Sequence, residues 1–116
     1  MKNNYVFTYG TLLRGERNHH LICDEDFVCE AKVNGFIMFN LGTYPGIYPG
    51  DDVIEGEIYL VDDETLAKLD SLEEEGSLYK RQLIKAYSSD KEYEVYIYIY
   101  NLEEKDPKYI KSWKKR

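Results

Sequence analysis

The stretch Glu-Tyr-Glu-Val-Tyr-Ile-Tyr-Ile-Tyr at residues 92–100 has the most regular alternation of hydrophobic and polar positions in the chain. Successive side chains of a strand point to opposite faces of a sheet, so this period of two predicts a strand. Residues 53–61 alternate in the same way, and shorter β-rich segments predict strands at 5–9 and 79–87. Residues 28–39 mix apolar and polar positions and suit one or two strands.

Glycine, proline and asparagine mark the expected breaks between these strands. Asn34-Gly35 predicts a turn or a bulge, and the segments 44–46 and 48–52, each containing Pro-Gly, predict turns. Two short helices are expected outside the sheet. One starts at Asn18, whose side chain could cap it, and the other opens at Pro107 and packs the end of the chain against the domain.

The main helix is predicted at residues 63–75, where the period changes from two to that of a helix. Aspartates stand at its start, where they can accept free backbone N–H groups, and Gly76 stands where a left-handed C-cap belongs. The leucines of the segment form one apolar stripe, at positions 66, 69 and 72.

Several strands with one main inserted helix predict an α+β fold. A small mixed sheet that curls into a β-barrel, with a few surface helices, would leave the fewest unpaired strand edges. The 116 residues, of which 43% are hydrophobic, are expected to form a single domain, 1–116, with one core.

The net charge of −7 argues against a nucleic-acid partner, which needs a basic face. Residues 107–116 carry five Lys/Arg and no acid, and we interpret them as a solvated helix end rather than a nucleic-acid tail. No apolar run is long enough to cross a bilayer and no signal peptide is evident, so we expect a cytoplasmic protein without a membrane partner. Cys23 and Cys29 lack metal-ligand spacing, and no metal site is expected. The oligomeric state is not predicted.

Glu73 is the main candidate for chemistry, because it falls on the apolar face of the predicted helix. At about 100° per residue it lies between Leu66 and Leu69, roughly 40° from the centre of the leucine stripe, whereas Glu74 and Glu75 point to solvent. A carboxylate aimed at the interior has a raised pKa, which suits proton transfer near neutral pH. The alternative is a helix-end glutamate that turns outward or pairs with an arginine.

Four motifs in order resemble the γ-glutamylcyclotransferase-like family, especially its γ-glutamylamine cyclotransferase branch with the AIG2-like proteins. The first is Tyr9-Gly10-Thr11-Leu12 after the first strand, with Arg14-Gly15 and Asn18-His19 close behind. The others are the segments 55–59 (Glu-Gly-Glu-Ile-Tyr), 69–73 (Leu-Asp-Ser-Leu-Glu) and 79–81 (Tyr-Lys-Arg). The resemblance covers residues 5 to about 100.

The resemblance implies a small barrel with a cavity at one side. It also implies a reaction that turns a γ-glutamyl amide or γ-glutamylamine into 5-oxoproline and a free amine, without a cofactor. Glu73 occupies the position of the family's catalytic carboxylate and would take a proton from the substrate α-ammonium and return it to the leaving amine. The expected substrate-binding residues are Tyr9, Gly10, Thr11, Leu12, Tyr79 and Arg81.

Three alternatives remain open at this point. Gly10-Thr11-Leu12 could be an anion cradle of backbone N–H groups or an ordinary turn after a strand. Arg81 could pair with Glu73 or with substrate, or could be a surface cation, and His19 is expected to have a structural, hydrogen-bonded role. The whole domain could also be a non-catalytic binding module for small molecules, because a fold does not guarantee an activity.

Overall fold

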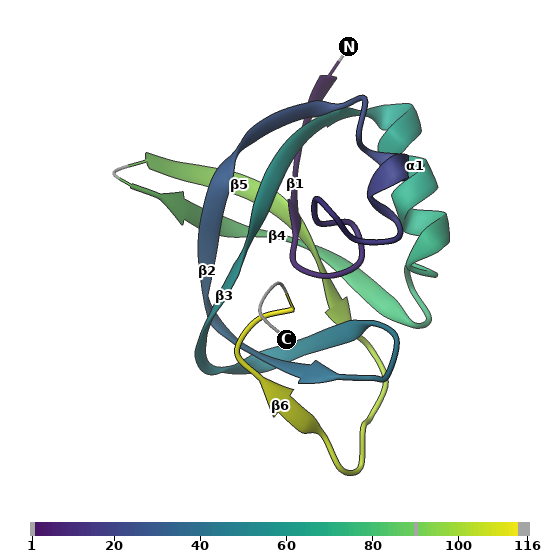
Figure 1. Ribbon diagram of the computed structural model, residues 1–116, viewed down its shortest axis with the longest axis vertical. Helices are drawn as coiled ribbons and strands as arrows, with labels where there is room; N and C mark the ends of the chain where they lie inside the picture. The colour runs from purple at the N-terminus through teal and green to yellow at the C-terminus, as the bar shows by residue number, and fades with distance from the viewer. Residues whose placement is uncertain (1, 90, 114–116) are drawn as a thin grey trace.

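The computed structural model describes residues 2–89 and 91–113 (Figure 1). In chain order, its elements are β1 (Lys2–Thr8), the 3-10 helix η1 (His19–Leu21), β2 (Asp26–Asn40), β3 (Pro45–Asp62), α1 (Asp63–Leu72), β4 (Tyr79–Ser88), β5 (Lys91–Tyr100) and β6 (Lys108–Ile110). No helix in this described part is long and apolar enough to cross a membrane.

The strands form one mixed sheet in the order β3-β1-β5-β4-β2-β6. β1 runs parallel to β5, and the other pairs are antiparallel. Because β2 also pairs with β3, the sheet closes into a ring. A mostly β structure with one main helix agrees with the predicted class.

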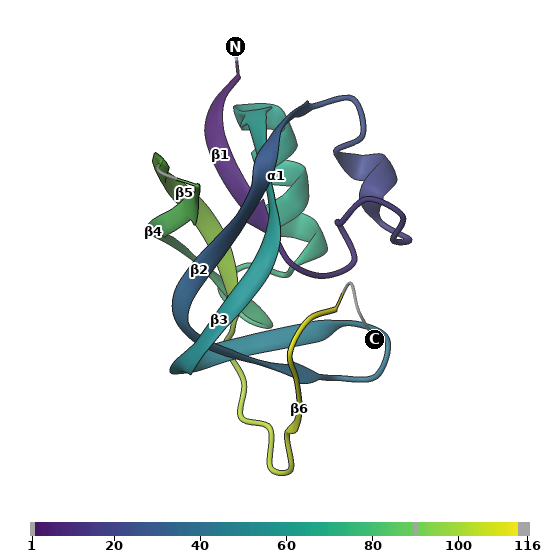
Figure 2. The ribbon, with the colours of Figure 1, turned by 60° about the vertical axis from the view of Figure 1, so that its left-hand side comes forward.

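The long hairpin of β2 and β3 bends where the sequence predicted breaks. Phe36 pairs with both Pro49 and Asp52, so the residues between them form a bulge inside β3 rather than the predicted turn that ends a strand. Gly35, with φ +89°, lies at a register shift in β2, as expected for a bulge. Beyond the bend the hairpin runs in a different direction, and β6 lies along the β2 strand of this lower part (Figures 1 and 2).

Buried side chains form two clusters on either side of β1. The first fills the ring, with Phe7, Ile58, Val95 and Ile97 among its members. The second lies between the sheet and α1, and it consists of Val6, Leu12, Ile22, Tyr59, Val61, Leu66, Leu69, Tyr79 and Tyr98. The second cluster therefore fixes α1 beside the ends of β1 and β5.

Helix α1 starts as predicted and ends three residues early. The Asp62 carboxylate accepts a hydrogen bond from the backbone N–H of Thr65 at 2.8 Å, as an N-cap does. The helix ends at Leu72 because Glu74 takes the left-handed conformation, φ +51°, two residues before Gly76. Glu73 is therefore the C-cap residue, still with helical backbone angles (φ −85°, ψ −2°).

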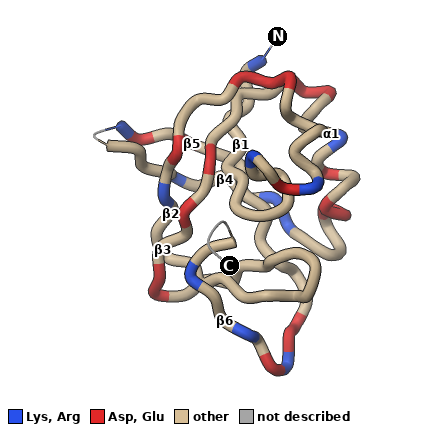
Figure 3. Tube along the Cα trace, viewed as in Figure 1, with Lys and Arg blue, Asp and Glu red and all other residues tan. Residues whose placement is uncertain are grey.

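The predicted tail helix after Pro107 is wrong. Lys108–Ile110 form β6, which pairs with residues 38–40 of β2. The edge of β2 offers unpaired backbone groups there, and a short helix in water is marginal, so strand addition is favoured. Residues 114–116 of the basic tail lie outside the described residues. Elsewhere, basic positions are scattered over several elements rather than gathered on one face (Figure 3).

The helix predicted at Asn18 is only the 3-10 turn η1, and the Asn18 side chain does not cap it. Its Nδ2 instead donates to Thr11 Oγ1 at 3.0 Å. A polar side chain next to a turn can satisfy backbone or side-chain partners on either side, and here the loop that precedes η1 provides the partner.

Candidate active site

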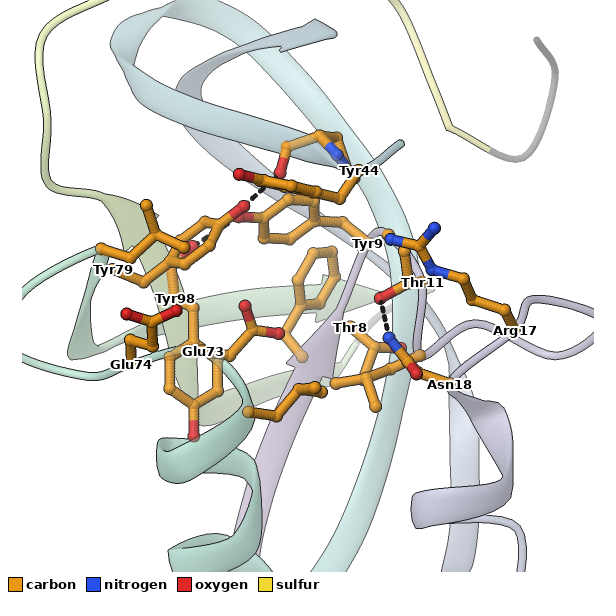
Figure 4. A pocket seen from close by; sticks show the side chains of 16 residues that line it. Thr8, Tyr9, Thr11, Arg17, Asn18, Tyr44, Glu73, Glu74, Tyr79 and Tyr98 are labelled. Atoms are coloured by element: carbon orange, nitrogen blue, oxygen red, sulfur yellow. Dashed lines mark hydrogen bonds between the residues drawn. The ribbon is translucent and has the colours of Figure 1, made fainter. Parts of the chain in front are cut away.

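A cavity of about 230 Å³ lies where the loop after β1 meets the end of α1 (Figure 4). Strands β4 and β5 and the β2–β3 connection complete its walls. The residues that line it are Phe7–Leu12, Arg17, Asn18, Tyr44, Pro45, Leu72–Glu74, Leu78, Tyr79 and Tyr98. The walls thus combine segments from both ends of the chain.

The Glu73 side chain projects into this cavity from the end of α1 (Figure 4). Burial raises the pKa of its carboxyl group from 4.5 to about 7. Among the described residues, no side chain or backbone group donates a hydrogen bond to this carboxylate, so nothing offsets the loss of solvation. Glu73 can therefore accept or donate a proton near neutral pH.

The loop Gly10-Thr11-Leu12 forms the opposite wall. It is folded by a hydrogen bond from the Leu13 N–H to the Gly10 carbonyl at 3.1 Å and by one from the Asn18 N–H to the Thr11 carbonyl at 2.9 Å. Within the described part of the chain, the N–H groups of residues 10, 11 and 12 donate no hydrogen bond. Consecutive free N–H groups suit a carboxylate ligand.

Gly10 also has a packing role that the sequence did not reveal. A Cβ at this position would lie 2.7 Å from Cγ of Pro45, which lines the same cavity. Real Cβ atoms do not approach so closely, so Gly10 lets the loop pack against the start of β3.

Three tyrosines of the cavity are held by their hydroxyl groups. Tyr9 donates to the Tyr98 carbonyl and Tyr79 donates to the Pro45 carbonyl, each at 2.6 Å. The Tyr98 hydroxyl donates to Asp70 at 2.7 Å. Burial raises the pKa of all three phenols, and the Glu73 carboxylate adds to each shift. They therefore stay neutral, with each hydroxyl proton engaged and each oxygen able to accept a bond.

Arg81 lies outside the cavity lining. Its Nη1 donates to Asp70 Oδ2 at 2.6 Å, and its guanidinium lies over the ring of Tyr96. Of the alternatives left open for Arg81, the pairing with Glu73 is therefore not what the structure shows, and the expected place among the residues that line the cavity is wrong. Asp70 instead links Arg81 to Tyr98, so Arg81 contacts the cavity wall indirectly.

The structure brings together six of the seven predicted site residues: Glu73, Tyr9, Gly10, Thr11, Leu12 and Tyr79. It also adds Arg17, Asn18, Tyr44 and Glu74, of which Asn18 was part of a quoted motif. The turn predicted at 44–46 is wrong, because Pro45 and Gly46 already belong to β3 and the chain bends just before them. His19 has the expected hydrogen-bonded role, because its Nδ1 lies 2.9 Å from the Leu12 carbonyl oxygen.

In chemical terms, the cavity combines a carboxyl group whose pKa lies near neutrality with a loop whose N–H groups make no hydrogen bond within the described residues. Glu73 and the residues Gly10, Thr11 and Leu12 line the same space. Among residues 2–89 and 91–113, no three His, Cys, Asp or Glu side chains gather closely enough to hold a metal ion. Such a cavity can bind a small carboxylate and move protons on it.

Known proteins resemble this chain in both sequence and fold. A family model described as Gamma-glutamyl cyclotransferase, AIG2-like, matches residues 6–115. The γ-glutamylcyclotransferase family protein YtfP of Escherichia coli is 37% identical over 79 residues, which cover 68% of this chain and 70% of that protein. Its solution structure has a TM-score of 0.72, with 32% identity over 94% of this chain and 93% of that one. The crystal structure of a mouse AIG2-like protein has a TM-score of 0.85, with 25% identity over 97% of this chain and 88% of that one.

Proposed function

Because the chain belongs to the γ-glutamyl cyclotransferase, AIG2-like family, we propose that it converts a γ-glutamyl amide or γ-glutamylamine into 5-oxoproline and a free amine. The observation that carries the proposal is the partly buried Glu73 carboxyl group, which lines the cavity and has a pKa of about 7. We also infer that the closed ring of strands corresponds to the small barrel implied by the family resemblance.

In the proposed mechanism, the nucleophile belongs to the substrate. Glu73 takes a proton from the α-ammonium group, and the resulting amine attacks the γ-carbonyl carbon to form the ring C–N bond. Glu73 then returns the proton to the departing nitrogen as the original amide bond breaks. After attack the ring nitrogen still carries a second proton, which also passes through Glu73 to the released amine, so the products are a neutral lactam and an ammonium ion. Atoms and charges then balance with proton transfer alone, and one carboxylate can serve each transfer.

The cavity would accelerate this reaction mainly by holding a folded substrate. Closing a five-membered ring is intramolecular, but an extended γ-glutamyl chain rarely places its amine beside its own γ-carbonyl group. The N–H groups of Gly10, Thr11 and Leu12 would hold the α-carboxylate, opposite Glu73. The walls formed by Tyr9 and Tyr79 would restrict the remaining torsions.

The test is the release of 5-oxoproline by the purified protein and by Glu73→Gln, across a panel of γ-glutamyl amides and amines. The amide keeps the shape of the side chain but cannot accept the proton, so turnover should be lost while the fold is retained. Glu64→Gln is the matched control, because Glu64 lies on the same helix, has an exposed side chain and does not line the cavity. Turnover by Glu73→Gln at a rate similar to the parent would show that Glu73 is not the base.

The same two proteins test the alternative of a binding module. A module without catalysis would be stabilised against heat by γ-glutamyl compounds, would release no 5-oxoproline at any pH, and would keep the stabilisation in Glu73→Gln. Thermal stabilisation by γ-glutamyl compounds without any turnover across the whole panel would therefore show that the protein is a binding module and not an enzyme.

A further inference from the structure

Glu57 is a buried carboxylate that the proposed mechanism does not use. It lies on β3, opposite Thr8 of β1, and its side chain is only 1% exposed. It does not line the cavity. The neighbouring Gly56 makes this place possible, because a Cβ there would lie 2.1 Å from the Thr8 carbonyl oxygen. Strands β1 and β3 therefore approach closely just before the cavity loop begins.

The Glu57 carboxylate binds both the main chain and the side chain of Arg14. Its Oε1 accepts the backbone N–H of Arg14 at 3.1 Å, and its Oε2 accepts Nε–H of the same residue at 3.0 Å. The Tyr59 hydroxyl also donates to Oε1, at 3.1 Å. Burial alone would raise the pKa of Glu57, but these donors together hold that pKa below its ordinary value. The carboxylate therefore stays charged.

Arg14 ends the loop whose residues Gly10, Thr11 and Leu12 line the cavity. It comes two residues after Leu12 and directly after Leu13, which is fully buried and closes the turn back to Gly10. The start of the loop is fixed to the same residue of β3, because Thr8 Oγ1 donates to the Glu57 carbonyl oxygen at 3.2 Å. Glu57 thus holds both ends of the segment that contains Gly10, Thr11 and Leu12.

A buried ion pair is a weak source of stability, because desolvation offsets most of its attraction, and apolar residues of similar volume often serve as well. A carboxylate that accepts a main-chain N–H does something an apolar residue cannot, since it fixes the path of the backbone. We propose that Glu57 is a positioning residue, which holds the Gly10–Leu12 loop in the conformation that binds the substrate carboxylate. This inference rests on the proposed function for its substrate.

The experiment compares Glu57→Met and Arg14→Gln with the parent. Methionine has a similar shape but cannot accept the main-chain N–H of Arg14, whereas Arg14→Gln removes only the side-chain bond. Lys85→Gln is the control, because it removes an exposed ion pair with Glu92, away from the loop. Hydrogen exchange of the Leu13 and Asn18 amides, whose hydrogen bonds fold the loop, reports loop order without substrate. Steady-state kinetics report its effect on the reaction.

We expect exchange at Leu13 and Asn18 to become about tenfold faster in Glu57→Met, to become faster by a smaller factor in Arg14→Gln, and to stay unchanged in the control. KM of Glu57→Met for a γ-glutamyl substrate should rise about tenfold while kcat stays within about twofold, because loop order affects binding more than proton transfer by Glu73. The double variant should be no worse than Glu57→Met, since that change already removes the side-chain contact that Arg14→Gln removes.

Unchanged exchange at Leu13 and Asn18 in the variants would overturn the inference, as would a loosened loop with an unchanged KM. A lower melting temperature with unchanged KM would reduce Glu57 to a structural residue. If the parent protein releases no 5-oxoproline, the proposed function is wrong. Hydrogen exchange of the loop amides and the Kd of 5-oxoproline then still decide whether Glu57 positions the loop. If Glu57→Met does not fold, Arg14→Gln decides, because the Arg14 side chain is half exposed and its loss leaves the main-chain bond in place.

Discussion

The pKa of Glu73, about 7, predicts a pH dependence that an ordinary glutamate would not show. With this pKa, about half of the carboxyl groups are charged at pH 7, about a tenth at pH 6 and about a hundredth at pH 5. If the charged form is the base, kcat/KM should fall about 50-fold between pH 7 and pH 5. A glutamate with the usual pKa near 4.5 would lose only about a quarter of its charge over that range. Initial rates of 5-oxoproline release in buffers of constant ionic strength give the profile directly.

The same titration should appear in the stability of the protein. The folded pKa is raised above the unfolded value of 4.5, so between these two pH values the folded state holds a proton that the unfolded state has lost. Stability is therefore highest below about pH 4.5 for this group and falls as the pH rises to about 7, with a total contribution of about 3 kcal/mol. Glu73→Gln has no such titration, so its unfolding free energy relative to the parent should increase by about that amount from pH 4.5 to pH 8.

Urea unfolding of both proteins at several pH values measures this difference, and the Glu64→Gln variant shows the background. Parallel stability curves for the parent and Glu73→Gln, together with a flat kcat/KM between pH 7 and pH 5, would refute the reasoning that burial controls Glu73. A pH-dependent rate with parallel stability curves would place the titrating group elsewhere.

Three further predictions follow from the site. Ring closure needs only proton transfer, so activity should survive dialysis against EDTA; loss of activity that a divalent ion restores would contradict the mechanism. Crystals soaked with 5-oxoproline should show its carboxylate on the N–H groups of the Gly10–Leu12 loop, and product bound elsewhere would contradict anion binding by this loop. Gly10→Val places a side chain against Pro45 and should raise the Kd of the product, measured by titration calorimetry, by about tenfold or more. Asp70→Asn should lower the unfolding free energy by about 1–3 kcal/mol in urea, because Arg81 and Tyr98 lose a charged acceptor; an effect no larger than that of Glu64→Gln would contradict this.

The sequence predicted the orientation of Glu73 correctly although it misplaced the end of the helix. Glu73 follows the last helical residue but keeps helical backbone angles, so its direction on the helical wheel still holds. The early end was not predictable from the usual signal, because the left-handed position is taken by Glu74 rather than by a glycine. The helical period of the sequence therefore identified Glu73 as the residue that points inward. The backbone angles at the end of the helix determine how its side chain enters the cavity.

The strands were largely predictable, because alternation depends on a local period and on one buried face. The contacts that needed the folded structure join distant parts of the chain. β6 forms because the edge of β2 is available to it, and Arg81 meets Asp70 rather than Glu73 because β4 runs beside the end of α1. The motifs predicted six residues of the cavity but could not show that Gly10 packs on Pro45.

The hydrogen bond from the Tyr9 hydroxyl to the Tyr98 carbonyl joins two residues that are 89 positions apart in the chain. It lies in the cavity wall, between the loop after β1 and the strand β5 that runs beside β1. The cavity wall thus depends on contacts between residues far apart in the chain, so a fragment that lacks either β1 or β5 cannot form it. An opening that separates these strands would disrupt the cavity, so a ligand bound there would stabilise the domain against unfolding by RT ln(1 + [L]/Kd).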